Sequence, residues 1–305
     1  MPLPPEFHEL AKKVNNWGRW GADDERGTLN LITDDVVKRG LACARTGRRF
    51  LLAIPLSEEG PQSGAVPGRT NPAHSMTAIH KPLVDPSGHS YSDDVVSMGL
   101  QAGTHWDSLV HVTYDGRLWN GLDPSVVSES GAARAGIDKA GVIAGRGVLL
   151  DVARARGQQR LPGGYGITPD DLDASSASVD IGSGDIILIR TGQIQVFKEG
   201  NRKAYANPSP GLTLATSLWF HERDVAAVAT DSLTFEVYPS ERKDALLPVH
   251  LLNLTEMGLT QGQNFDLEDL SKACAEDGVY DFFLEATPEP FVGGLGGPVA
   301  PVAIR

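Results

Sequence analysis

The segment GLQAGTHWDSLVHV, residues 99–112, places two histidines and one aspartate within seven positions. If the chain is extended there, His105 and Asp107 point to one side of the strand and Trp106 points to the other. An imidazole beside a carboxylate is a common start of a divalent metal site. The spacing therefore predicts metal chemistry at His105 and Asp107.

Two further side chains of this segment could join the pair. Gln101, four residues before His105, could bring its amide oxygen to the same centre. His111 lies beyond a simple shared geometry with the pair and suits proton transfer at the edge of the site. The alternative is a His–Asp pair that only stabilises a turn. The second histidine and the Gly-Thr pair that precedes His105 favour a functional site over that alternative.

Several motifs resemble one protein family. GTHWDSLVH is similar to the signature HxGTHxDxPxH of the cyclase family, which includes bacterial kynurenine formamidases and isatin hydrolases. Four other segments resemble that family in the same order along the chain: NWGRWG with DERGTLN, GDIILIRTG, LPVH and GGPVAPVAI. The first of them is similar to the N-terminal extension of a longer subgroup. The resemblance implies a swivelling β/β/α fold and, from the better-known members, metal-dependent amide hydrolysis.

The resemblance also implies residue roles. In the family, the first signature histidine, the GTH histidine and the aspartate bind a metal, and the last signature histidine is the general base or acid. The aspartate can bridge to a second ion, which the PxH histidine and a downstream glutamate also hold. The matching residues here are His105, Asp107 and His250 as metal ligands, with His111 as the proton-transfer residue.

Two positions depart from the family pattern. Gln101 stands in the place of the first histidine, and Gln263 stands in the place of the glutamate. Both remain possible ligands through their amide oxygens, although a neutral amide is a weak partner for zinc. Because two dications would face a single formal negative charge, we expect one divalent ion, zinc or manganese, or none, and the departures disfavour a second.

Short apolar runs predict the elements that hold these residues. Candidate buried strands cover residues 147–152, 185–190, 225–230 and 280–284, and candidate helices cover 213–224, 248–257 and 266–276. Residues 57–74 are rich in Pro, Gly and Ser and predict a long loop of the kind that often forms a lid. His74, His80 and His89 are expected at the surface in or after it. We predict one α/β domain, with an N-terminal extension over 1–50 and the catalytic domain over 51–305.

The bulk composition excludes several classes of protein. The chain has 305 residues, 41% hydrophobic and 22% charged, as in an ordinary globular protein. Its 27 basic and 39 acidic residues give a net charge of −12, which disfavours nucleic-acid binding. No segment has the length and apolarity of a membrane span, and the N-terminus lacks a signal peptide, so we expect a cytoplasmic protein. The resemblance implies a homodimer or homotetramer.

Three functions are compatible with these observations. The first is hydrolysis of a small cyclic or aryl amide by a metal-activated water with His111 as general base. Trp17 and Trp106 could line its aromatic substrate pocket. The second is a polyketide-type cyclase or dehydratase that works by histidine acid/base catalysis without a metal, which the two glutamines motivate. The third is a ligand-binding protein without catalysis, which the retained histidines and aspartate disfavour.

Overall fold

A nine-stranded mixed sheet organises the chain, and four of its strands run parallel at the centre. The computed structural model describes residues 3–84 and 86–305. The central strands are β7 (Ala144–Asp151), β9 (Ile186–Arg190), β11 (Ala227–Thr230) and β12 (Thr260–Gln263). They are short apolar runs because both faces of a covered parallel sheet are buried. Every residue of β9 and β11 is buried, which confirms these predicted strands.

Antiparallel strands complete the sheet on both sides. The full order is β1-β15-β13-β7-β9-β11-β12-β4-β14. One side holds β13 (Asp281–Glu285), β15 (Val302–Ile304) and β1 (Arg49–Leu51), and the other holds β4 (His105–Asp107) and β14 (Gly296–Pro298). In the register of β12 with β4, Gln263 lies opposite His105. Sheet pairing therefore brings the two distant sequence motifs together.

Helices pack along the sheet, and a helix is present in each of the three predicted segments. They are α1 (Pro5–Val14), α2 (Asp34–Leu41), α3 (Val152–Ala155), α4 (Pro169–Ser176), α5 (Ile194–Lys198), α6 (Arg202–Ala206), α7 (Thr216–Glu222), α8 (Pro248–His250), the π-helix η5 (Leu251–Met257) and α9 (Glu268–Asp277). Shorter elements are η1 (Gly27–Leu31), η2 (Trp119–Gly121), η3 (Pro124–Val126), η4 (Ile137–Lys139), β5 (Val127–Ser128), β6 (Gly131–Ala132), β8 (Gly166–Ile167) and β10 (Gly211–Leu212). The predicted helix 248–257 is divided into α8 and η5, and Gly258 ends it in the left-handed conformation that favours glycine.

The first fifty residues pack on the same core as the rest of the chain. Phe7, Ala11 and Val14 of α1 are buried in a hydrophobic cluster with residues of β7, β9 and η5. Their i, i+4, i+7 spacing places them on one face of the helix. The division at residue 50 stays a prediction, but the N-terminal segment is part of the core and α1 lies close to η5.

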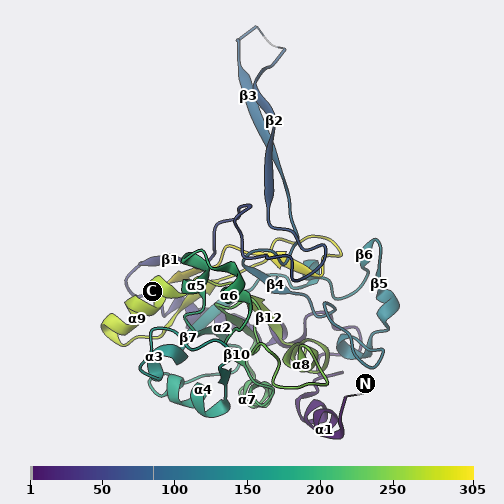
Figure 1. Ribbon diagram of the computed structural model, residues 1–305, viewed down its shortest axis with the longest axis vertical. Coiled ribbons are helices and arrows are strands. Elements are labelled where there is room, and N and C mark those ends of the chain that lie inside the picture. The colour runs from purple at the N-terminus through teal and green to yellow at the C-terminus, as the bar shows by residue number, and fades with distance from the viewer. Residues whose placement is uncertain (1–2, 85) are drawn as a thin grey trace.

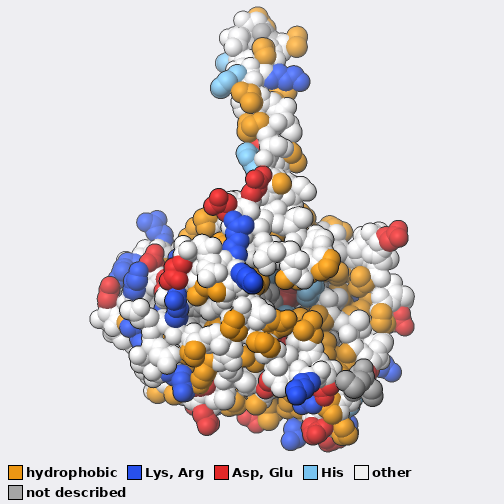
Figure 2. Space-filling model, in the orientation of Figure 1, with side chains coloured by type: hydrophobic (Ala, Val, Ile, Leu, Met, Phe, Trp, Pro, Cys, Tyr) orange, Lys and Arg blue, Asp and Glu red, His pale blue; other side chains and the backbone are white. Residues whose placement is uncertain are grey.

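A long hairpin projects from the body and was missed by the sequence prediction. It consists of β2 (Ala73–Pro82) and β3 (Ser90–Ser97), paired antiparallel, and stands far outside the rest of the fold (Figure 1). Apolar and polar side chains are both exposed along it (Figure 2). His74, His80 and His89 are exposed, as predicted, and His74 pairs with Asp94 at 2.7 Å. Neither face of the hairpin is covered by the body. Its strands therefore lack the alternation of buried apolar and exposed polar residues that identifies a strand in a sequence.

Candidate active site

Strand β4 holds His105 and Asp107 on one face, as their spacing predicts. His105 Nε2 lies 3.4 Å from Asp107 Oδ1, and both side chains are about 1% exposed. The Nδ1–H group of His105 donates to the Gly103 carbonyl at 2.8 Å. This hydrogen bond leaves the Nε2 lone pair facing the carboxylate. Two acceptors therefore face each other, and neither His105 Nε2 nor Asp107 Oδ1 has a hydrogen-bond partner among the described residues.

Helix α8 brings His250 to the other oxygen of Asp107. His250 Nε2 lies 3.8 Å from Asp107 Oδ2. Glu236 accepts hydrogen bonds from the backbone N–H groups of Val249 and His250, each at 3.0 Å, and from His250 Nδ1 at 2.5 Å. Glu236 therefore caps the helix and also fixes the tautomer of His250. Nothing near Glu236 in the sequence shows which imidazole its carboxylate meets.

The side chain of Gln263 fills the space between Asp107 and His250. Its Nε2 lies 3.0 Å from Asp107 Oδ2 and 3.2 Å from His250 Nε2. Both of those atoms are acceptors, so the amide must present its two N–H groups to them and its oxygen elsewhere. Gln261 donates to the same carboxylate oxygen at 3.4 Å. Asp107 Oδ2 thus accepts hydrogen bonds from two side-chain amides, whereas Asp107 Oδ1 has no hydrogen-bond donor among the described residues.

His111 lies at the open side of this cluster. Its Nε2 is 3.9 Å from Asp107 Oδ1, and its side chain is 20% exposed, far more than those of His105 and His250. Burial lowers the pKa of His111 despite the opposing effect of the Asp107 carboxylate, so the ring is neutral near neutral pH. Burial alone would raise the pKa of Asp107, but the surrounding histidines hold it well below its usual range. An anionic carboxylate beside a neutral imidazole suits proton transfer.

The remaining predicted site residues are Gln101, Trp106 and Trp17. The Gln101 amide packs against Gly296 of β14, and no hydrogen bond joins it to His105 or Asp107 in the described part of the chain. Trp106 was predicted to line the pocket, and the structure corrects this. Its ring is fully buried against Phe265, and its Nε1–H donates to the Ala286 carbonyl at 2.8 Å. Because β4 alternates, the orientation that points His105 to the site sends Trp106 into the core.

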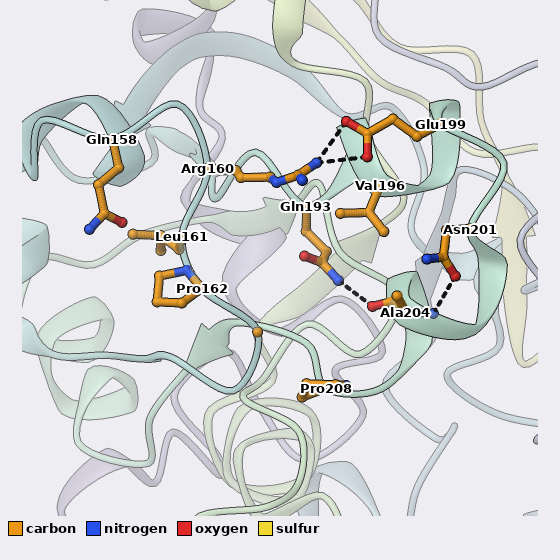
Figure 3. Close-up of a pocket in the computed structure, with 11 residues that line it drawn as sticks. Gln158, Arg160, Leu161, Pro162, Gln193, Val196, Glu199, Asn201, Ala204 and Pro208 are labelled. Atoms are coloured by element: carbon orange, nitrogen blue, oxygen red, sulfur yellow. Dashed lines mark hydrogen bonds and ion pairs between the residues drawn. The ribbon is translucent and has the colours of Figure 1, made fainter.

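Trp17 does line a cavity, although a different one. It donates to the Thr255 carbonyl at 2.7 Å and borders a space of about 440 Å³ with Tyr114 and Glu256. A larger cavity, of about 550 Å³, lies between residues 158–163 and 193–208 (Figure 3). Arg160 and Glu199, its charged residues, form an ion pair with each other, and both side chains are exposed to solvent. Neither cavity includes the His/Asp cluster.

The atoms of the cluster fit one divalent ion better than two. A separation of 3.4 Å between His105 Nε2 and Asp107 Oδ1 equals the edge of a tetrahedron with metal–ligand distances of about 2.1 Å. A second ion between Asp107 and His250 does not fit, because the N–H groups of Gln263 occupy that space. No group of three or more His, Cys, Asp or Glu side chains in the described ranges already has the geometry of a metal site. The cluster thus offers two ligand atoms, His105 Nε2 and Asp107 Oδ1, for one ion.

Arg69 is a charged residue near the cluster that the sequence reasoning missed. It lies in the segment 57–72 and interacts electrostatically with both Asp107 and His111. In the sequence it stands in a Pro- and Gly-rich stretch with nothing to distinguish it from a solvated loop arginine. Only the folded position of the loop could have identified it.

Comparisons with known proteins agree with this architecture. The family model named Cyclase matches residues 36–237. The crystal structure described as a novel cyclase is 37% identical, with coverage of 97% of this chain and 99% of that chain, and a TM-score of 0.88. The chain belongs to the cyclase family. The expected resemblance and the α/β fold class are thereby confirmed.

More distant relatives of this cyclase-family chain share the fold. Isatin hydrolase A from Labrenzia aggregata, bound to benzyl benzoate, is 18% identical over 84% of this chain and 93% of its own, with a TM-score of 0.63. A potential metal-dependent hydrolase with cyclase activity is 16% identical over 84% of this chain and 98% of its own, with a TM-score of 0.51. No curated protein matches the chain. Within the described residues, no helix of this cyclase-family chain is long and apolar enough to cross a membrane.

Proposed function

We propose that this cyclase-family protein hydrolyses a small cyclic or aryl amide with the help of one divalent ion, zinc or manganese. His105 Nε2 and Asp107 Oδ1 would hold the ion. One observation carries the proposal: two buried acceptor atoms face each other at 3.4 Å without a donor between them. Buried polar atoms are rarely left without a partner, and a cation satisfies both. Relatives described as an isatin hydrolase and a potential metal-dependent hydrolase support the reaction class.

A bound ion would supply Lewis acidity, which polarises the substrate carbonyl and lowers the pKa of water from about 15.7 towards about 7. His111 would take the proton of the attacking water: burial lowers its pKa, its Nε2 lies 3.9 Å from Asp107 Oδ1, and its side chain is 20% exposed. The same imidazole then returns the proton to the leaving nitrogen as the C–N bond breaks. The products are a carboxylate and an amine. This proton transfer contributes about 10²–10⁴ to the rate.

Glu236 and His250 keep the other side of Asp107 fixed. The Glu236 carboxylate holds the His250 ring, and Gln263 connects that ring to Asp107 Oδ2. All three side chains are buried. Asp107 is therefore oriented with Oδ1 towards His105 and His111, which is the orientation the reaction requires.

The proposal is tested by metal analysis and activity on the same preparation. We expect one equivalent of zinc or manganese in protein purified without added metal, hydrolysis of an aryl formamide such as formanilide, and loss of both with a chelator. His105→Ala should lose the metal, whereas His111→Ala should keep the metal and lose the activity. Full activity of metal-free protein would refute the proposal.

A second candidate is a cyclase or dehydratase reaction that uses His111 for acid/base catalysis without a metal. The position of Gln263 favours it. Its uncharged amide occupies the space between Asp107 and His250 and donates hydrogen bonds to both, so these two side chains are satisfied without a cation between them. Chelator-resistant proton exchange of a β-keto substrate, abolished in His111→Ala, would support this reaction over hydrolysis.

A further inference from the structure

The segment 57–72, which contains Arg69, is held by hydrogen bonds within itself and to the chain just before His105. The Asn71 amide closes the segment by donating to the carbonyls of Glu58 at 3.2 Å and Gln62 at 2.9 Å. Gln62 in turn donates to the carbonyl of Ala102 at 3.1 Å. The segment is thus connected to the residues immediately before His105. It was predicted as a long loop, and these bonds give it a defined position.

Gly99 provides the space for the Arg69 side chain. A Cβ atom at Gly99 would lie 3.1 Å from Arg69 Cγ, so the stem of the arginine passes closely over this residue. The Gly99 backbone N–H also donates to the Thr70 carbonyl at 3.1 Å. The Arg69 side chain is thus packed on Gly99, and its charge interacts electrostatically with Asp107 and His111.

The Arg69 guanidinium has no counter-ion of its own. Among residues 3–84 and 86–305, no carboxylate lies within the 4.0 Å limit of an ion pair and no hydrogen bond involves its side chain. Arg69 is half-buried, and burial lowers its pKa, whereas the pKa of the well-paired Arg190 is raised. A partly desolvated charge without a partner costs free energy that an arriving anion recovers.

The net charge of the site also favours the binding of an anion. In the described part of the chain, Asp107 and Glu236 are the carboxylates within 4 Å of the histidines of the cluster. Glu236 is already satisfied by two backbone N–H groups and the His250 ring. Arg69 and one divalent ion would bring three positive charges. One positive charge is left for the substrate to balance.

We propose that Arg69 binds a carboxylate of the substrate, so that the protein acts on acidic amides in preference to neutral ones. This inference rests on the proposed function for the reaction, but the binding of the carboxylate can be measured without it. The planar guanidinium donates two parallel hydrogen bonds to a carboxylate, which gives orientation as well as affinity. The scissile carbonyl is then held beside His105, Asp107 and His111.

Calorimetric titration with benzoate and its neutral isostere benzamide tests the inference. Wild-type protein should bind benzoate more tightly than benzamide. Arg69→Gln should weaken benzoate binding about 10–100-fold and leave benzamide binding within about twofold. Arg69→Lys should recover part of the benzoate affinity, because it keeps the charge and loses the planar fork. Arg49→Gln, at an exposed arginine without an ion pair in the described residues, is the matched control and should change neither.

The outcomes separate the two proposals. Unchanged benzoate affinity in Arg69→Gln, equal weakening of both probes, or no benzoate binding by the wild type would each overturn the role of Arg69. If benzoate binding depends on Arg69 but the protein hydrolyses neither N-formylanthranilate nor formanilide, the anion site stands and the amide hydrolase assignment fails. Thermal unfolding of Arg69→Gln checks that the variant is folded.

Discussion

Replacing Gln263 with glutamate changes the charge at the centre of the cluster and nothing in its shape. The amide nitrogen that donates to Asp107 Oδ2 at 3.0 Å and to His250 Nε2 at 3.2 Å becomes a carboxylate oxygen. Both neighbours lose their donor. We expect Gln263→Glu to destabilise the metal-free protein strongly and to create affinity for an additional divalent ion.

The magnitude follows from the distance. Two unit charges 3.0 Å apart repel by about 5–6 kcal/mol at an effective dielectric constant of about 20. Protonating the new glutamate near neutral pH costs about 3.7 kcal/mol, at about 1.36 kcal/mol per unit above its ordinary pKa of about 4.3. Protonation is the smaller of the two costs, so it limits the loss of stability to about 3–4 kcal/mol.

The sign of the pH dependence follows from the same argument. The folded variant holds a proton that the unfolded chain releases, so the pKa of the introduced carboxyl group is raised on folding. The stability of the variant relative to wild type therefore falls as pH rises above about 4.3. The difference should shrink by about 1.4 kcal/mol for each unit of acidification until that pH is reached.

Urea unfolding in a chelator at several pH values measures this difference, and zinc or manganese is then added. An ion at about 100 times its dissociation constant should return about 2.7 kcal/mol to the variant. Gln158→Glu adds the same charge at an exposed position and should behave as wild type. A metal-free Gln263→Glu within about 1 kcal/mol of wild type at neutral pH would show that Gln263 does not connect Asp107 and His250 as described.

Further predictions concern the proton-transfer residue and the buried networks. His111→Ala should lower kcat about 10²–10⁴-fold with little change in KM. Because burial lowers the pKa of His111, kcat/KM of the wild type should stay level down to about pH 6.5 and fall only below it, as protonation removes the base. Glu236→Gln should cost about 1–3 kcal/mol in urea unfolding, since one amide oxygen cannot accept all three bonds, and ¹⁵N spectra should show a second tautomer at His250. Arg190→Leu should cost about 3–5 kcal/mol by breaking its buried pairs with Asp151 and Glu268, whereas the exposed pair of Arg160 is worth about 1 kcal/mol or less in the same assay.

The central sheet could be predicted because its strands leave a clear pattern. Continuous apolar runs such as those of β9 and β11 occur where both faces of a strand are covered. The hairpin β2–β3 left no such pattern, since its residues are exposed on both faces. Strand β4 is only three residues long and was found through its chemistry, with His105 and Asp107 on one face.

The site could be predicted only where its residues are close in the sequence or carry a motif. His105 and Asp107 share one strand, and His250 was identified through its resemblance to the PxH segment. Glu236 and Arg69 reach the cluster through tertiary structure, so their sequence neighbours give no indication of it. The prediction for Trp106 was wrong. Neighbouring residues of a strand point to opposite faces, so the residue next to His105 points away from the site and into the core.

The amide at position 263 and the guanidinium at position 69 change the electrostatics of the site in the same sense. An amide in place of a carboxylate removes one negative charge from beside Asp107, and Arg69 adds a positive charge that interacts with Asp107 and His111. Both changes make a dication harder to hold and an anion easier to hold. An acidic substrate resolves the conflict, because its carboxylate compensates Arg69 and so reduces the repulsion between the arginine and an ion on His105 and Asp107. Metal affinity and substrate affinity should therefore be coupled: benzoate should tighten the binding of the ion in wild-type protein, and this effect should disappear in Arg69→Gln.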